Sequence, residues 1–432
     1  MDNLGINSEE VRIMMRKLGI EVDGAEQEFN QLSRSAQDME NLKNQVLDFF
    51  SITNAVQIFK NAVRDAVETI KELDAAMTET AVVTDFSIGD MWEKLPEYSN
   101  QATKLGSSIK SLYEATTLYY QQGLNSQQAM NVGIETMKMA RIANMDAEAA
   151  TTAMTAALRG FNMEINELSA QRINDVYSEL AAVTAADTSQ IAAAMSKTAS
   201  IASSANMEFE TTAALLAQII ETTQEAPETA GTAMKTIIAR FTEVKKLFSQ
   251  GMLTGEDEEG EVIDINKIDA ALKTVGISLK DFLNGSKGID DIFLELAGKW
   301  DTLDLATQRY IATTAAGSRQ QSRFLAMMSN YDRTMELVNA ATNSAGASQK
   351  QFEKTLDSLE AKLQRLSNAW DTFTMGLANN EVVKFGVDLL TNLLELANDL
   401  TDDLGSTAGA IAKLGIALIG LKTGGSIFNS IF

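Results

Sequence analysis

The sequence predicts an all-α protein in which long amphipathic or coiled-coil helices flank tandem helical hairpins, with a small turn or β-hairpin insertion near residues 251–264. The 432 residues include only two prolines, Pro96 and Pro227. Because proline removes a helix hydrogen bond and clashes with the preceding turn, so few of them permit long helices. Aromatic residues make up 6% of the chain, too few for the bulky strands of a sandwich or barrel. Apolar residues also recur at steps of three and four, as helices require.

The charge balance and the missing residue types limit the chemistry of the chain. It carries 59 acidic and 36 basic side chains, a net charge of −23, whereas binding to a phosphate backbone depends on lysine and arginine. No specific nucleic-acid partner is therefore expected. The chain has no histidine and no cysteine, which excludes Ser-His-Asp and Cys-His catalysis and zinc sites built from thiolates or imidazoles. We predict that the protein is not an enzyme, holds no cofactor or metal, and works by shape and contact.

Two stretches have apolar residues at alternating steps of four and three, which is a heptad seam. The first seam consists of Ile52, Val56, Phe59, Val63, Ala66, Ile70, Leu73 and Met77. The second consists of Phe352, Leu356, Leu359, Leu363, Leu366, Trp370, Phe373 and Leu377. Each seam is interpreted either as a self-associating coiled coil or as a long amphipathic helix packed on its own domain, since bundles use the same spacing.

Between the seams, a stretch rich in Ala, Ser, Thr and Met predicts two tandem helical hairpins. Its near-repeat of 62 positions relates Asn144 to Asn206. Each unit has the pattern of cap, helix, short turn, cap and helix, and the expected N-caps are Asn125, Asn144, Asp187 and Asn206. The small side chains would let neighbouring helix axes approach closely, and we interpret them as packing residues rather than a ligand site.

Two charged clusters are interpreted as features of the surface. The acidic run of residues 256–261 lacks the ligand spacing of a calcium loop, so a solvated loop is expected there. The only basic concentration in the sequence consists of Arg309, Arg319, Arg323 and Arg333. Binding an acidic partner helix and balancing the local charge are both open, and the second is favoured.

Residues 408–421, AGAIAKLGIALIGL, are apolar apart from Lys413. As a helix they would extend about 21 Å, which is less than the roughly 30 Å hydrocarbon core of a bilayer. We predict a packed helix or partner surface, a membrane-seeking segment, or an end exposed by truncation. The residues of the expected membrane or partner surface are Ile411, Leu414, Ile416, Leu418, Ile419 and Leu421. The abrupt apolar end leads us to expect a fragment of a longer chain.

These patterns divide the chain into seven expected segments. They are an N-terminal helical segment at 1–50, a long heptad helix at 51–99, the tandem-hairpin core at 100–250, the acidic turn or hairpin at 251–265, a second helical subdomain at 266–346, a heptad helix and the helix that follows it at 347–400, and the apolar C-terminal segment at 401–432.

Several short stretches are together similar to a known family. They are residues 74–84, 120–125, 157–161, 311–320 and 323–325. Their order over residues 50–380 resembles the core region of the tail tape measure proteins of long-tailed phages and prophages. The resemblance implies a non-enzymatic protein of the virion, assembled in the host cytoplasm, that fills the tail lumen, sets tail length, organises the tail tip and leaves ahead of the genome.

The resemblance also implies the partners. They are tail-tip or baseplate proteins, tail-tube proteins, further copies of the chain itself, and the host inner membrane during ejection. Residues 408–421 support an alternative function, that of a membrane-acting helical protein such as a pore-forming or secreted effector.

Overall fold

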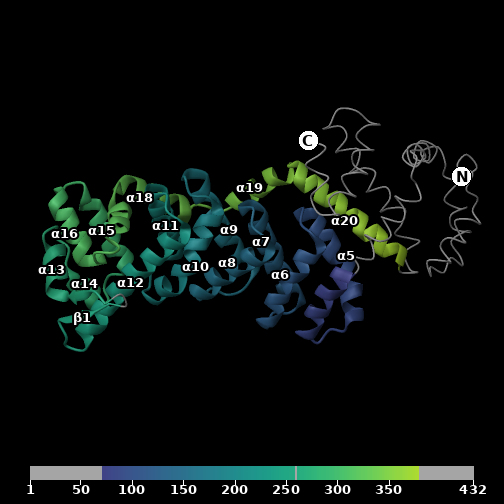
Figure 1. Ribbon diagram of the computed structural model, residues 1–432, viewed down its shortest axis with the longest axis horizontal. Coiled ribbons are helices and arrows are strands. Elements are labelled where there is room, and N and C mark those ends of the chain that lie inside the picture. Colours follow the sequence, from purple (N-terminus) through teal and green to yellow (C-terminus); the bar gives the residue numbers. More distant parts are fainter. Residues whose placement is uncertain (1–70, 258–259, 379–432) are drawn as a thin grey trace, which may run out of the picture. The chain divides into compact units, whose positions relative to one another are not determined.

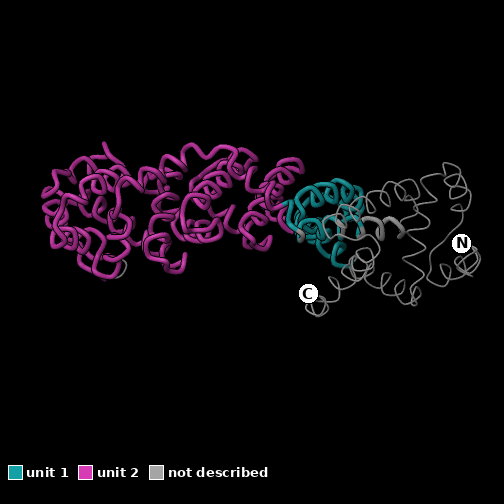
Figure 2. Tube along the Cα trace, turned by 90° about the horizontal axis from the view of Figure 1, so that it is seen from above, with its two compact units in different colours: residues 1–113, 356–432 teal, residues 114–355 magenta. Residues whose placement is uncertain are grey.

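The computed structural model describes residues 71–257 and 260–378. The prediction of an all-α protein with a small β-hairpin is confirmed, because the described elements are helices apart from two short antiparallel strands. The chain forms two compact units, residues 1–113 with 356–432, and residues 114–355 (Figure 2). The boundaries of these units fall inside helices α6 and α19.

In the first unit, the described helices bury apolar side chains at helical spacing. They are residues 71–82, α5 (Ile88–Leu105), the beginning of α6 (Ile109–Gln121) and α20 (Leu359–Ala378). The first seam does not continue as one helix to residue 99. The chain turns after residue 82, and Ser87 begins α5 through a reciprocal capping box with Asp90, whose backbone N–H donates to Ser87 Oγ at 3.1 Å.

The first unit is held together by aromatic stacking and by a polar contact to α20. The rings of Tyr98 and Tyr113 are stacked with centroids 3.7 Å apart, and Tyr113 Oη donates to the carbonyl of Met91 at 3.0 Å. Helix α20 packs against α5. Asn368 on α20 is buried and donates to the carbonyl of Ser107, in the turn after α5, at 2.7 Å.

The second unit contains an array of helices in chain order (Figure 1). They are α7 (Ser126–Ala143), α8 (Ala147–Gly160), α9 (Glu167–Val183), α10 (Thr188–Ser204), α11 (Phe209–Thr223) and α12 (Pro227–Ser249). Their N-caps recur every 20 or 21 residues from α7 to α11, at Asn125, Asp146, Asn166, Asp187 and Glu208. The array is therefore a series of successive hairpins.

The predicted N-caps are confirmed at Asn125 and Asp187 and wrong at Asn144 and Asn206. Asn144 has φ 50° and ends α7 in the left-handed conformation, and Asn206 has φ 61° in the following α10–α11 turn. Asparagine tolerates this conformation because its short polar side chain bonds to nearby backbone. The cap of α8 is Asp146, two residues later, whose carboxylate accepts from Ala149 N at 2.7 Å.

Helix α10 lies very close to both α8 and α12. A Cβ added to Gly160 on α8 would lie 2.4 Å from the Ala199 Cβ of α10. One added to Gly231 on α12 would lie 2.4 Å from the Ala194 carbonyl oxygen of α10. Because the two helices lie so close, Thr198 Oγ1 on α10 donates a hydrogen bond to the carbonyl of Gly231 on α12 at 3.0 Å. The predicted role of small residues in close packing is thus confirmed for these three helices.

The remaining helices of the second unit form a more aromatic core at the end of α12. They are α13 (Ile265–Lys273), α14 (Leu279–Leu283), α15 (Ile289–Trp300), α16 (Leu305–Ala316), α17 (Gln321–Met328) and α18 (Tyr331–Thr342). Edge-to-face contacts connect Phe241, Phe282, Phe293, Phe324 and Trp300, with ring centroids 5.3 to 6.1 Å apart. Before α13, strands β1 (Thr254–Glu256) and β2 (Val262–Asp264) pair in the predicted hairpin.

The second seam is divided between two helices, α19 (Ala347–Leu356) and α20. Residues 357 and 358 are not helical. Ser358 begins the new helix, because its Oγ accepts from Ala361 N at 3.2 Å. The apolar spacing alone does not detect this interruption, since it continues across it unchanged.

We predict that Gly231→Ala destabilises the array by about 1–3 kcal/mol, because the added methyl group collides with backbone rather than with a movable side chain. Urea unfolding of the two proteins measures the difference. Gly89→Ala is the matched control, since a Cβ there lies 3.5 Å from Ser87 Oγ, an ordinary contact. Equal effects of the two substitutions would show that the α10–α12 distance is not limited by Gly231.

Candidate interaction surfaces

Several of the described seam residues are buried in the chain. Leu73 is 2% exposed, Phe352 5% and Leu363 8%. Leu356 is half-buried, and Leu359, Leu366 and Trp370 lie on α20. Met77 of the first seam is also buried. The remaining residues of that seam lie outside the described residues; they are Ile52, Val56, Phe59, Val63, Ala66 and Ile70. Self-association through either seam therefore stays a prediction.

The apolar segment at 408–421, with Ile411, Leu414, Ile416, Leu418, Ile419 and Leu421, also lies outside the described residues. None of the helices that the structure describes combines the length and the apolar character of a membrane span.

A buried carboxylate holds α19 against α9. Asp175 is 5% exposed and accepts hydrogen bonds from Gly346 N at 2.9 Å, from Ser348 N at 3.0 Å and from Ser348 Oγ. One turn further along the two helices, Gln351 Nε2 donates to the carbonyl of Ser178 at 2.5 Å. Asp175 therefore caps a helix that begins 172 residues later in the chain. Sequence analysis missed Asp175, because nothing in its local pattern distinguishes it from other helical acids.

A buried ion pair fixes the β-hairpin. Arg240 on α12 pairs with Asp257, and the two side chains are 4% and 5% exposed. The same guanidinium donates to the carbonyl of Val262 at 2.7 Å. On the other side, the carboxylate of Glu261 accepts from Ser318 N at 2.7 Å. The expectation of a solvated acidic loop is thus wrong for Asp257, whose charge is neutralised by an arginine that is distant in sequence.

The predicted balancing of local charge is confirmed for two of the four arginines. Arg323 forms a bidentate pair with Glu225 at 2.8 and 2.9 Å. Arg333 contacts Glu221 at 3.2 Å. Both pairs connect α17 or α18 to the end of α11 and the turn after it.

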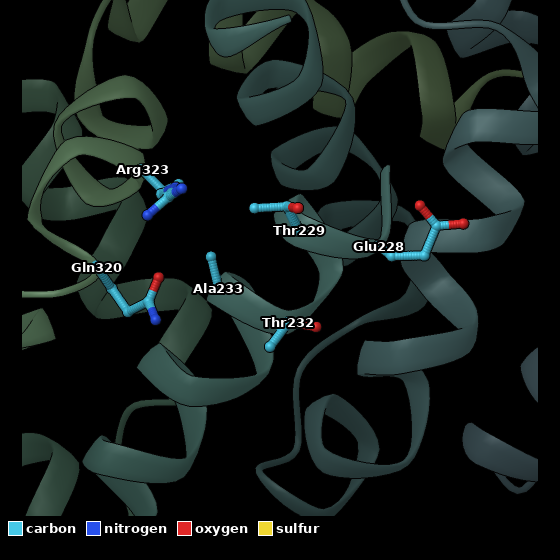
Figure 3. A pocket seen from close by; sticks show the side chains of 6 residues that line it. All are labelled: Glu228, Thr229, Thr232, Ala233, Gln320 and Arg323. Carbon is cyan, nitrogen blue, oxygen red and sulfur yellow. The ribbon is translucent and has the colours of Figure 1, made fainter. Parts of the chain in front are cut away.

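Arg323 also borders a shallow pocket of about 290 Å³. Figure 3 shows Arg323 and Gln320 opposite Thr229 and Ala233 of α12; Thr232 and Glu228 complete the lining. The guanidinium is already bound by Glu225. Across the described ranges, no group of three acidic side chains is arranged to hold a metal ion.

Deep burial also shifts the pKa of two tyrosines of the array. Burial raises the pKa of Tyr119 to about 12, although its hydroxyl is hydrogen-bonded to Thr136 at 2.6 Å. Burial likewise raises the pKa of Tyr177. Both hydroxyls therefore stay protonated at neutral pH. The Tyr119 hydroxyl is hydrogen-bonded, whereas the Tyr177 hydroxyl is buried without a hydrogen-bond partner.

Stacked helical hairpins whose buried polar side chains fasten distant elements place the chain in the class of all-α helical-array proteins. The chain belongs to the phage-related minor tail protein family, whose model matches residues 99–317. It is therefore a structural component of a phage tail.

Among curated proteins, the chain is similar to the tape measure protein of Pneumococcus phage Dp-1. The two are 23% identical over 316 residues, which cover 71% of this chain and 25% of the phage Dp-1 protein. The chain thus spans about a quarter of the length of this relative. No solved structure matches the chain significantly.

We expect Arg240→Leu to cost about 3–5 kcal/mol, because it leaves the buried Asp257 carboxylate without the positive charge that neutralises it. The free energy of unfolding in urea measures the loss, and amide hydrogen exchange in residues 254–264 locates it. Arg309→Leu removes an exposed arginine as the control. Unchanged exchange in the hairpin would mean that the ion pair does not hold it.

Proposed function

We propose that this chain is the folded core of a tail tape measure protein, which determines tail length, scaffolds assembly of the tail tip and tube, and takes part in genome ejection. The observation that carries the proposal is the similarity to the phage Dp-1 tape measure protein over most of the chain. The match to the minor tail protein family is consistent with it.

A helical, proline-poor chain suits a molecular ruler. A continuous helix advances about 1.5 Å per residue, so residue number converts linearly into length. In the hairpins of the second unit, residue number is not proportional to length, because the chain folds back on itself. We therefore assign the described region to the compact portion that anchors at the tail tip, and the ruler to other parts of the protein in the tail lumen.

The proposed partners follow from this position. They are tail-tip or baseplate proteins, tail-tube subunits and further copies of the chain, with assembly in the host cytoplasm. The host inner membrane is a proposed contact during ejection. The alternative of a pore-forming or secreted effector depends on residues 408–421 alone, and no described residue favours it.

If the protein is the ruler, its length must set the length of the tail. Inserting four heptads of continuous helix into the phage gene, outside the part that encodes residues 99–317, should lengthen the tails by about 42 Å. Electron microscopy of negatively stained virions measures the change. The control replaces 28 residues by the same four heptads and should leave tail length unchanged. Tails of the original length after the insertion would rule out the proposed function.

Self-association is tested with the purified chain. Sedimentation equilibrium should show oligomers that the double substitution Leu359→Asp and Leu363→Asp abolishes, because charges are costly in a buried seam. Leu168→Asp, at an α9 position that is 75% exposed, should leave association unchanged. Circular dichroism confirms that each variant keeps its helix content. A wild-type chain that stays monomeric at high concentration would contradict the proposal of multiple copies.

A further inference from the structure

The β-hairpin of the second unit has one covered edge and one open edge. On the covered side, the carbonyl of Val262 in β2 accepts from the Arg240 guanidinium at 2.7 Å. On the open side lies β1, whose first and last residues, Thr254 and Glu256, are exposed. A strand edge with free N–H and C=O groups is a template on which another strand can pair.

The register shows which backbone groups of β1 are free. The carbonyl of Leu253, directly before β1, accepts from Ile265 N at 2.9 Å, so the backbone of Leu253 faces β2. Successive residues of an antiparallel strand direct their backbone groups to opposite sides, and those of Thr254 and Glu256 therefore point away from β2. No hydrogen bond within the described part of the chain uses these outward groups.

Strand β1 is held firmly in place on its inner face. A Cβ added to Gly255 would lie 2.7 Å from Leu247 Cδ1, so the backbone of β1 lies directly on a side chain of α12. Ile263, which is opposite Gly255 in the hairpin, is 0% exposed. The buried pair of Arg240 and Asp257 fastens the end of β1. An edge fixed in this way loses little conformational entropy when a further strand is added.

The chain around this edge also exposes apolar side chains. Met252 and Leu253, which lead into β1, are 47% and 50% exposed. Phe248 at the end of α12 is 48% exposed, and Val262 on β2 is 64% exposed. One exposed apolar residue is ordinary, but a group of them near an open strand edge is typical of a protein-interaction surface.

The charge of the hairpin indicates the kind of partner. Residues 254–264 contain six acidic residues and no basic one. Two of the six are paired with basic side chains from outside this stretch, Asp257 with Arg240 and Asp264 with Lys267. The hairpin therefore keeps an excess of negative charge, which favours a positively charged partner.

Glu256 places this charge at the open edge, because it lies on β1 and is exposed. On a strand added beside β1, the side chain directly opposite Glu256 would have its Cβ about 4.5–5.5 Å away. A lysine or arginine is favoured at that position, and an acidic side chain is disfavoured. Pairing β1 with β1 of a second copy would bring two acidic hairpins together, which argues against self-association at this edge.

We propose that the open edge of β1 binds an extended, positively charged segment of a partner tail protein, which adds to the hairpin as a third strand. The backbone of this segment bonds to Thr254 and Glu256, and its basic side chains lie beside Glu256. Its apolar side chains cover Met252 and Leu253. The inference deepens the proposed contact with tail-tip or tail-tube proteins, and it rests on that proposal for the identity of the partner.

The test uses the full 432-residue chain and three synthetic peptides of about six residues, a usual length for a strand. The first peptide alternates lysine and valine. The second has glutamate in place of lysine. The third is the first peptide methylated at the backbone nitrogens of its lysines, which would face β1. Fluorescence anisotropy measures binding, and amide exchange followed by mass spectrometry measures protection of residues 253–257.

Two variants change the edge itself. Thr254→Pro removes one outward N–H, at a position of an edge strand where proline is tolerated. Glu256→Lys reverses the charge on β1. Asp332→Lys is the matched control, because it makes the same change of charge at an exposed position of α18. Circular dichroism verifies that each variant keeps its helix content.

The lysine peptide should bind the wild-type chain and protect residues 253–257. The methylated peptide and the glutamate peptide should bind about tenfold more weakly, because one lacks the hydrogen-bond donors and the other has the wrong charge. Thr254→Pro and Glu256→Lys should each weaken binding of the lysine peptide about tenfold, and Glu256→Lys should strengthen binding of the glutamate peptide. Asp332→Lys should match the wild-type chain.

Three results would overturn the proposal. They are no binding of the lysine peptide at millimolar concentration, equal binding of the methylated peptide, and equal weakening by Asp332→Lys and Glu256→Lys. If Thr254→Pro does not fold, the methylated peptide still tests the backbone contact. Because these measurements need no virion, their failure is distinguishable from a failure of the tail-length experiment.

Discussion

The close approach of α10 to α8 and α12 is the constraint on which the second unit depends. Gly160 and Gly231 leave no room for a methyl group, and the facing positions on α10 are Ala194 and Ala199. Dispersion attraction falls steeply with distance. The close contact between the helix backbones therefore supplies attraction that the small side chains alone would not. Larger side chains close the array at its end, where Phe241 of α12 joins an aromatic cluster with Phe282, Phe293, Phe324 and Trp300.

Elements outside the three-helix contact are fastened by single polar side chains. Asp175 caps α19, Arg240 holds the hairpin, and Gln218 Nε2 donates to the carbonyl of Ser329 at 2.8 Å. At the start of α11, the side chain of Glu208 does not cap the helix. Instead, the backbone N–H of Glu208 donates to the carboxylate of Asp290 on α15 at 3.3 Å. Burial raises the pKa of Asp290, a sign that its carboxylate has lost water to make this contact. Each of these polar contacts fixes the relative orientation of the two elements it connects, which non-directional apolar packing does not do.

The sequence predicted the helical class, the hairpin and the role of small residues because these follow from periodicity and composition. It did not predict the caps reliably, since asparagine serves both at the start of a helix and in the left-handed turn after one, as Asn144 shows. Arg240 and Asp257 lie 17 positions apart, and Asp175 and Ser348 lie 173 apart. Such pairs have no local pattern, because only the tertiary fold brings them together. The seam spacing likewise carried no information about the break at Ser358.

The hairpin array has a consequence for any ruler to which it belongs. Two successive helices of the array occupy about 41 residues, which as one continuous helix would extend about 62 Å. Stacked as a hairpin, they advance the array by only one interhelix distance, about 8–10 Å. Changing the number of hairpins would therefore alter length several times less per residue than changing a continuous helix. A protein that measures length gains a fixed, compact end from such an array, because small changes within it hardly affect the total length.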